Sequence, residues 1–290
     1  MRKFIYLLMA SALMLSFTGC IDNPLEEEQY MKKVYIVGAA DEIQTKDVYF
    51  TSDDEQETYI SVGVGGSLLI DSDVQFTLAE ADEAIDDYNN RYIGVGKPRY
   101  HKIDEGLYSV PSMSGAIKAG KTYARVPIKI KARDLNCDSL YMLSFKLASA
   151  SCEISRPDTI LLFTVNMVNQ YSGYYQFSAN KQELSDGQPV GNPSMVASVR
   201  TLKAIDEHEL RFFNLTTIEE NVNIANACIR IKINPEDHTL SMSGWDKLEI
   251  LSCEGVYDPD EKCFTFTYVY RDVDGRTYSV DGTMKPVEEN

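Results

Sequence analysis

The sequence predicts an all-β protein built from antiparallel sheets. Apolar and polar residues alternate along many short segments, a pattern typical of strands that bury one face. Only one segment has the composition of a helix, and an Asp-Gly pair separates two strand-like segments near the C-terminus, as in a tight hairpin. Many short strands with few helices favour β-sandwiches or β-barrels.

The alternation is clearest over residues 125–131, 229–234 and 263–270, where valine, isoleucine or aromatic residues occupy every second position. Asp274-Gly275 follows the third segment and suits a type I′ turn, because both central residues of that turn need positive φ. The remaining predicted strands are Val34–Val37, Tyr59–Val64, Val74–Leu78, Met142–Leu147, Ile160–Val168, Met195–Leu202 and Leu248–Ser252. The predicted helix runs from Ala79 to Asn90 and turns Ile85 inward.

The chain is long enough for two domains. A boundary is predicted near residues 169–173, after a long apolar strand and before a new run of aromatic residues. It leaves a β-sandwich domain at residues 31–169 and a C-terminal all-β domain at residues 170–290, both of common domain size.

The N-terminus has the pattern of an export signal. Two basic residues precede the apolar run Phe4–Leu15, which is too short to span a bilayer as a helix, and small residues follow it. The residues before Cys20 resemble the lipobox of bacterial lipoproteins, in which the cysteine becomes the lipidated first residue of the mature chain. Residues 1–19 are therefore predicted to be a signal peptide, and residues 20–30 a lipidated N-terminus and flexible acidic tether.

The resemblance to lipoproteins implies a location at the outer membrane, where the chain is lipid-anchored and faces the extracellular side. The acidic run behind Cys20 also resembles the surface-export signal of Bacteroidetes lipoproteins. Residue types alone leave open a plain solvated linker, and a secreted protein in which Cys20 is incidental is the alternative to the anchor.

Charge and cysteine content narrow the function further. The chain has 28 basic and 44 acidic side chains and a formal charge of −16, which argues against a nucleic-acid partner because phosphate binding needs a basic surface. Export permits disulfides, but an odd number of cysteines follows Cys20, so free buried thiols are favoured over a disulfide framework. These five are Cys137, Cys152, Cys228, Cys253 and Cys263.

A family resemblance follows from motifs in order along the chain. The motifs are Asp-Asp-Tyr-Asn-Asn-Arg-Tyr at 86–92, Gly-Leu-Tyr-Ser-Val-Pro at 106–111, Ala-Gly-Lys at 119–121 and Tyr-Met-Leu-Ser-Phe-Lys-Leu at 141–147. Their order resembles an uncharacterised β-sandwich domain at the N-terminus of many Bacteroidetes surface lipoproteins, where it also precedes family 18 glycoside hydrolase modules. Residues 171–175 and 268–283 resemble a second, smaller all-β domain. The resemblance implies an N-terminal immunoglobulin-like antiparallel β-sandwich with one short helix and a C-terminal antiparallel β-barrel or sandwich.

A search for chemical motifs predicts no enzyme. The HExxH, CxxC, P-loop and GxSxG patterns do not occur, and neither does the acidic strand-end motif of the resembled hydrolases. The three histidines lie far apart in the sequence, so no catalytic residue, metal ligand or cofactor is predicted.

Glycan binding is the function that the remaining side chains favour. Trp245 and Asp246 follow a Ser/Gly stretch and pair an amphipathic ring with a hydrogen-bond acceptor, although a Trp that closes the end of a barrel would look the same. Tyr171, Tyr174 and Tyr175 lie at the predicted domain junction, where ligand clefts often form.

The sequence thus predicts a non-catalytic cell-surface lipoprotein. Its expected role is that of a glycan-binding accessory protein in a polysaccharide or N-glycan utilisation system, next to outer-membrane glycan importer proteins. The alternative is a surface scaffold or adhesion module that binds a protein partner and has no affinity for sugar.

Overall fold

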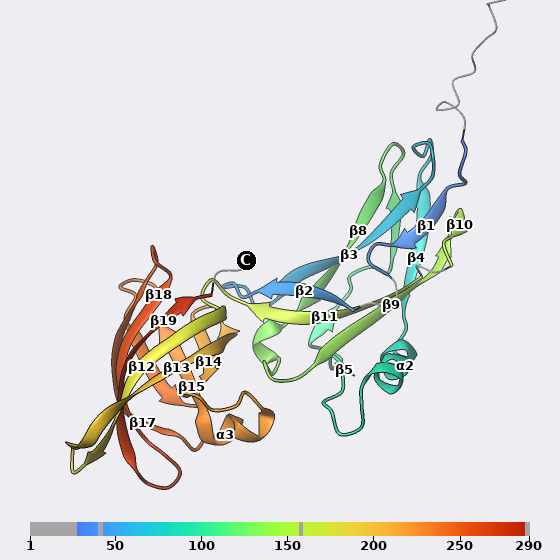
Figure 1. Ribbon diagram of the computed structural model, residues 1–290. Coiled ribbons are helices and arrows are strands. Elements are labelled where there is room, and N and C mark those ends of the chain that lie inside the picture. The colour runs from blue at the N-terminus through green and yellow to red at the C-terminus, as the bar shows by residue number, and fades with distance from the viewer. Residues whose placement is uncertain (1–27, 40–42, 157–158, 288–290) are drawn as a thin grey trace, which may run out of the picture.

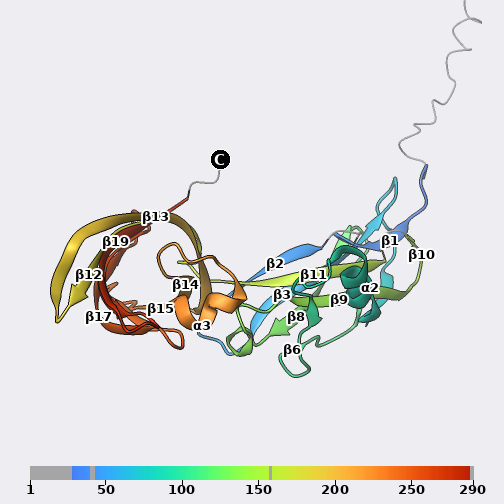
Figure 2. The same cartoon turned by 60° about the horizontal axis from the view of Figure 1, so that its bottom comes forward.

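The computed structural model describes residues 28–39, 43–156 and 159–287, and these form two β-rich units that adjoin each other (Figure 1). The first is a sandwich of two sheets, and the second is one eight-stranded sheet that curls into a barrel. A second view shows the units end to end, with the barrel at the opposite end of the sandwich from the first described residues (Figure 2). The predicted all-β class is confirmed.

The sandwich pairs a five-stranded sheet with a six-stranded sheet. In spatial order, the first holds β10 (Glu153–Ile154), β1 (Lys33–Ile36), β3 (Gln56–Gly65), β8 (Tyr123–Ile130) and β6 (Tyr108–Ser109). The second holds β2 (Gln44–Tyr49), β11 (Ile160–Val168), β9 (Tyr141–Ala150), β4 (Val74–Glu80) and β7 (Ser114–Ile117), and β5 (His101–Lys102) pairs beside β9. Most neighbours are antiparallel, but β2 runs parallel to β11.

The sandwich core forms where the inward residues of the two sheets meet. Val126, Ile128 and Ile130 of β8 are at most 3% exposed, as their alternation with charged residues predicted. On the facing sheet, the rings of Phe145 and Phe163 stack with centroids 6.1 Å apart. Each such buried side chain stabilises the fold by about 1.5–3 kcal/mol, and together they hold the two sheets against each other.

The barrel follows the sandwich along the chain. Its strands, in spatial order, are β16 (Leu240–Gly244), β15 (Cys228–Ile233), β14 (Glu209–Phe213), β13 (Gln188–Asp206), β12 (Gly173–Ser185), β19 (Thr277–Pro286), β18 (Cys263–Arg271) and β17 (Glu249–Asp258). The two end strands approach each other, and a single bridge between Thr239 and Val256 nearly closes the sheet. Phe264, Phe266 and Tyr268 point inward and are at most 1% exposed, as predicted.

Helices are few and short. They are α2 (Glu83–Tyr92), α3 (Ile224–Ala227) and the 3₁₀ turns η1 (Ala132–Asp134) and η2 (Asn221–Asn223). The predicted helix start at Ala79 is wrong, because Ala79 and Glu80 extend β4 and pair with β9. The prediction that Ile85 faces inward is confirmed, since it is 4% exposed.

The hairpin between β18 and β19 differs from the predicted type I′ turn. Arg271 pairs with Thr277, so the loop spans residues 272–276, and of its two predicted central residues only Gly275 has positive φ, at 82°. The Asp272 carboxylate accepts the backbone N–H groups of Asp274 and Arg276 at 3.0 and 2.9 Å. This side-chain capping stabilises the longer loop.

The five cysteines after Cys20 are free thiols in the structure. Cys253 and Cys263 do not face each other across the β17–β18 hairpin, because Cys253 pairs with Tyr268 and Cys263 with Asp258.

None of the helices in the described part of the chain has the length and apolar content to cross a membrane. The predicted signal peptide and Cys20 lie outside the described residues.

Candidate functional site

A cleft of about 400 Å³ lies where the sandwich meets the barrel. Strands β2 and β11 and the start of β9 line one wall. The start of β12 and the last part of β13 line the other. The polar side chains that face it include Thr45, Tyr100, Tyr141, Asn166, Tyr174 and Thr201. Domain junctions are preferred places for ligand sites, and this cleft offers both aromatic rings and hydrogen-bonding groups.

Tyr174 enters the cleft because of the alternation of β12. Tyr175 and Phe177 point into the barrel core and are 4% and 0% exposed, so Tyr174 points outward and is 62% exposed. It pairs with Thr201 on β13, which faces the same cleft. The backbone carbonyl of Tyr174 accepts the N–H of Val287 at 2.9 Å, which fixes the strand beneath the ring.

A buried ion cluster joins the two units beside the cleft. Asp138, from the loop before β9, contacts the guanidinium of Arg211 on β14 and accepts a hydrogen bond from Lys203 Nζ at 3.0 Å. The Arg211 side chain is 1% exposed and the Asp138 side chain 9% exposed. Arg211 also donates to the Sγ atom of Cys228 at 3.1 Å. Burial acts to lower the pKa of Arg211, but the nearby Asp138 carboxylate outweighs it, so that pKa is raised overall.

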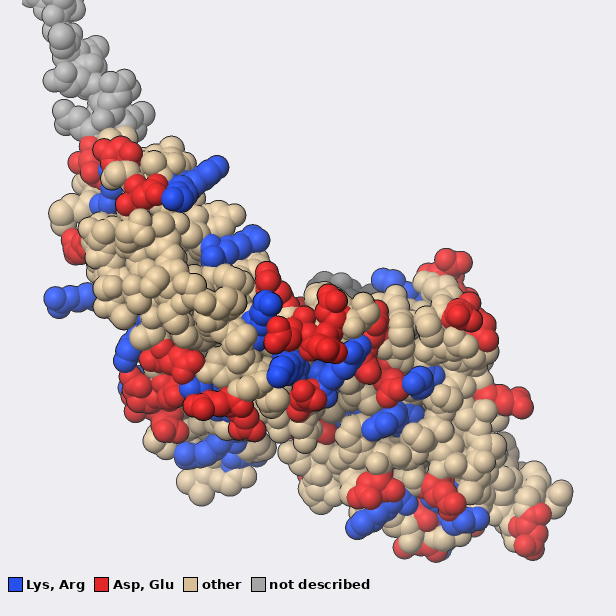
Figure 3. Space-filling model, turned by 180° about the vertical axis from the view of Figure 1, so that it is seen from behind, with Lys and Arg blue, Asp and Glu red and all other residues tan. Residues whose placement is uncertain are grey.

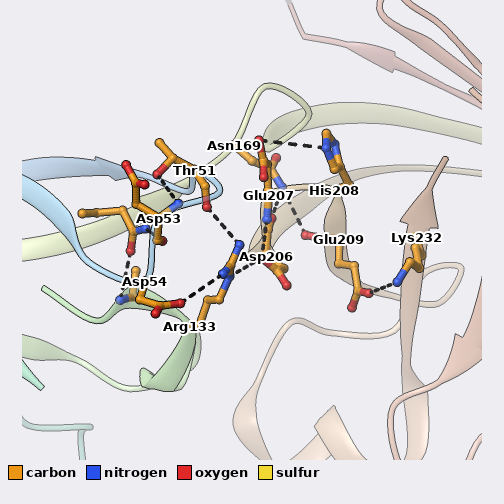
Figure 4. A network of polar contacts seen from close by, with 12 residues as sticks. Thr51, Asp53, Asp54, Arg133, Asn169, Asp206, Glu207, His208, Glu209 and Lys232 are labelled. Atoms are coloured by element: carbon orange, nitrogen blue, oxygen red, sulfur yellow. Dashed lines mark hydrogen bonds and ion pairs between the residues drawn. The ribbon is translucent and has the colours of Figure 1, made fainter. Parts of the chain in front are cut away.

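A second polar network joins the units at another point of the junction (Figure 4). Arg133 Nε lies 2.7 Å from Asp206 Oδ1, and Arg133 Nη2 donates to the Thr51 carbonyl at 2.9 Å. Asn169 Nδ2 donates to the Asp206 carbonyl at 2.7 Å. Partial burial acts to raise the pKa of the Asp206 carboxyl, but hydrogen bonds from the Glu207 N–H and Arg133 outweigh it and lower that pKa.

A hollow of about 490 Å³ adjoins this second network and is lined by Arg133, His208, Glu209 and Lys232 among others. Lys232 lies 3.1 Å from Glu209, and Arg133 binds Asp206, so charged groups of opposite sign pair with each other here. Acidic and basic side chains also intermingle where the units meet in the view from behind (Figure 3). Over the described residues, no three His, Cys, Asp or Glu side chains are placed to hold a metal ion.

Two of the predicted ligand-binding residues belong to the core instead. Tyr171 is 2% exposed and its ring packs against Tyr257 with centroids 4.9 Å apart. Tyr175 is 4% exposed and packs against Phe264. A sugar cannot stack on a ring that the core already covers, so the structure corrects both predictions.

Trp245 and Asp246 do not line the cleft. Trp245 follows β16, is half-buried, and lies with its ring centroid 5.1 Å from the guanidinium carbon of Arg230. The backbone N–H of Trp245 donates to the Cys228 carbonyl at 2.9 Å, which anchors the loop to the barrel, while Asp246 is exposed. The cleft therefore takes Tyr174 alone from the predicted set.

Tyr100, Tyr141 and Asn166 are cleft residues that sequence reasoning missed. Tyr100 and Tyr141 lie 41 positions apart, and both line the cleft because β5 pairs with β9 in parallel, with His101 opposite Tyr141. Asn166 is oriented by Asp47, whose carboxylate accepts a hydrogen bond from the side-chain amide of Asn166 at 2.8 Å. No spacing in the sequence signals these contacts, because they depend on strand pairing.

Two family models match this chain, one over its N-terminal part and one over its C-terminal part. One family model, described as an N-terminal domain, matches residues 29–154, and another, described as C-terminal, matches residues 159–285. Strand β11 falls within the C-terminal match, although it pairs with β2 and β9 in the sandwich. No curated protein matches the sequence.

Several solved structures share the fold. A protein of unknown function from Bacteroides ovatus has a TM-score of 0.65 and 18% identity, covering 88% of this chain and 94% of its own. A multidomain protein including DUF1735 from Bacteroides ovatus has a TM-score of 0.64 and 18% identity, covering 88% and 93%. An auxiliary nutrient binding protein from Bacteroides thetaiotaomicron has a TM-score of 0.59 and 17% identity, covering 84% and 91%. Identities this low establish similarity of fold alone.

Proposed function

The chain belongs to the two-domain family whose N-terminal and C-terminal models it matches, and from that premise we propose that it is a non-catalytic glycan-binding protein. The observation that carries the proposal is the cleft at the junction of sandwich and barrel, into which the exposed Tyr174 ring projects.

The chemistry of the cleft suits a sugar. A tyrosine ring offers an apolar face to the C–H groups of a pyranose and a hydroxyl at its edge. Around Tyr174, the side chains of Thr45, Asn166 and Thr201 supply hydroxyl and amide groups that hydrogen-bond to sugar hydroxyls. A volume of about 400 Å³ has room for one or two sugar rings, within the usual range for small-ligand sites.

The cleft also has the rigidity that a binding site needs. The Asp138–Arg211 contact and the Arg133–Asp206 pair both cross the junction, so both walls are held in place before a ligand arrives. Preformed walls reduce the entropy lost on binding. The auxiliary nutrient binding protein with the same fold supports a binding role rather than catalysis.

Replacing Tyr174 with Ala should weaken glycan binding about tenfold or more, because a central aromatic contact often contributes about 2 kcal/mol and 1.4 kcal/mol is tenfold in affinity. The measurement is an array screen of host and plant glycans with residues 21–290, followed by titration calorimetry on each hit.

Tyr123→Ala is the matched control, since Tyr123 is 52% exposed on the sandwich and does not line the cleft. An equal loss of glycan affinity in Tyr174→Ala and Tyr123→Ala would contradict the cleft as the binding site. Absence of binding to every glycan would reject the sugar ligand and leave the scaffold role, whereas release of reducing sugar would indicate an enzyme.

We also propose that Cys20 carries a lipid that anchors the chain at the outer membrane, facing outward beside glycan importer proteins. The support is the sequence pattern before Cys20. Cys20→Ala should abolish both incorporation of labelled fatty acid and retention in the membrane fraction. Unchanged labelling would show that the anchor is elsewhere or absent.

A further inference from the structure

Strand β13 extends well beyond one of its two neighbours. It pairs with β12 from Gln188 to Leu202, but with β14 only from Lys203 to Asp206. The β12–β13 hairpin therefore projects from the barrel on the side away from the sandwich, in both ribbon views (Figures 1 and 2). Along that projection β13 is an edge strand.

The backbone groups on this edge can be assigned. The Thr201 N–H donates to the Glu219 carboxylate rather than to β12, so odd-numbered residues of this segment direct their N–H and C=O groups away from β12. The register is continuous from Thr201 to Ser194, which places Met195, Ala197 and Val199 in the same orientation. In the described chain, the N–H and C=O groups of these three residues have no hydrogen-bond partner.

Protection of the edge is limited to its two ends. Pro189 and Pro193 lie near the tip, and prolines discourage strand pairing. At the base, the segment 215–219 lies along residues 198–201, since Ser198 Oγ donates to the Leu215 carbonyl at 2.9 Å and Arg200 donates to the Thr217 carbonyl at 2.6 Å. The side chains of Met195 and Val199 nevertheless remain 84% and 50% exposed. An open edge flanked by exposed apolar residues is a site for strand addition.

The charge distribution favours a second copy of this chain as the occupant. The protein has a formal charge of −16, so most faces of two copies repel each other. Residues 188–199 of β13 and residues 173–180 of the adjacent β12 contain no charged side chain. The stretch from Met195 to Val199 is thus neutral on an acidic protein, while Lys181, Glu183 and Asp186 lie toward the hairpin tip.

We infer that two copies of the chain pair through β13, antiparallel and with Ala197 on the twofold axis. Met195 of one copy then lies opposite Val199 of the other, and each opposed pair exchanges two backbone hydrogen bonds. The two barrels share one continuous sheet across the contact. A single pair of short strands buries little surface, so the dimer is weak, with micromolar or poorer affinity.

Sedimentation velocity of residues 21–290 over a range of concentrations tests the pairing. Ala197→Pro removes an N–H that the monomer does not use, so the variant should fold normally and dimerise at least about tenfold more weakly. Val199→Lys should act in the same direction, while Asn192→Lys, at an exposed position of β13 nearer the hairpin turn, is the matched control. A variant with Ala197→Cys should form an intermolecular disulfide under oxidation that the natural chain does not form, because opposed strand residues meet disulfide geometry.

A natural chain that stays monomeric at the highest attainable concentration, together with no disulfide at position 197, would overturn the inference. So would a dimer that Ala197→Pro and Val199→Lys leave unchanged. If Ala197→Pro instead abolished binding of another protein by a monomeric chain, the edge would receive a foreign strand and self-pairing would be wrong.

Discussion

Asp138→Ala is expected to destabilise the chain by about 3–5 kcal/mol, because it leaves a buried guanidinium without its counter-charge. Arg211 is 1% exposed, and its Nε atom already has no hydrogen-bond partner in the described structure. Loss of Asp138 also removes the ion pair of Lys203, which keeps its hydrogen bond to the Cys137 carbonyl. The midpoint of urea unfolding, followed by far-ultraviolet circular dichroism, measures the loss.

The same variant should also uncouple the two units. Asp138 belongs to the sandwich and Arg211 to the barrel, so the contact transmits stability between them. Two resolved unfolding transitions are expected in place of one. Glu249→Gln is the matched control, since its pair with Arg271 is exposed and such pairs contribute at most about 1 kcal/mol. Near-identical curves for the two variants would show that the buried pair is not a stabilising link.

A double variant separates the ion pair from the packing around it. Replacing Asp138 with Ala and Arg211 with Met together removes both charges, so no lone buried charge remains. The double variant should therefore be more stable than Asp138→Ala alone. If the destabilisation of the double variant equalled the sum of the destabilisations by Asp138→Ala and Arg211→Met alone, the two groups would act independently.

Gly244→Ala is expected to cost about 3 kcal/mol or more, at the upper end of the range for overpacking. A Cβ atom at this position would lie 1.6 Å from the carbonyl oxygen of Leu248, and a backbone atom cannot rotate away as a side chain can. Gly244 ends β16 just before Trp245, so the variant must displace the loop that holds the ring.

Thermal unfolding measures the loss of stability, and tryptophan fluorescence reports on the loop because Trp245 is the single tryptophan. Gly94→Ala is the matched control: its nearest neighbouring atom would be 3.9 Å away and its φ is not positive, so a change within about 0.5 kcal/mol is expected. A stable Gly244→Ala variant with natural fluorescence would mean that the Leu248 backbone moves at little cost.

Local patterns were a good guide to the strands and a poor guide to where elements end. The alternation around Ile128 predicted a buried face correctly, because it reflects which side of a single strand avoids water. The helix start was misplaced because Ala79 and Glu80 favour a helix by composition, yet pairing with β9 holds them in a strand. Long-range pairing outweighs local preference there.

The site was harder to predict than the fold for the same reason. Tyr174 and Tyr175 are neighbours with identical side chains; strand alternation puts their rings on opposite faces of β12, and only the pairing of the sheet decides which face is the core and which is the cleft. Chemistry that suits a sugar also suggested Trp245, but the fold leaves it away from the cleft. Residue type indicated the kind of contact, and strand pairing decided its place.

The sequence by itself determined the all-β class and the inward face of many strands, because period-two alternation depends on neighbours along one strand. It also predicted the pattern of an exported lipoprotein around Cys20, which stays a prediction. Only the tertiary structure decided that Asp138 and Arg211, 73 positions apart, share one buried contact, that Tyr174 enters a cleft, and that β13 keeps an open edge. These features arise from how sheets pair and pack across the chain, and no local pattern encodes them.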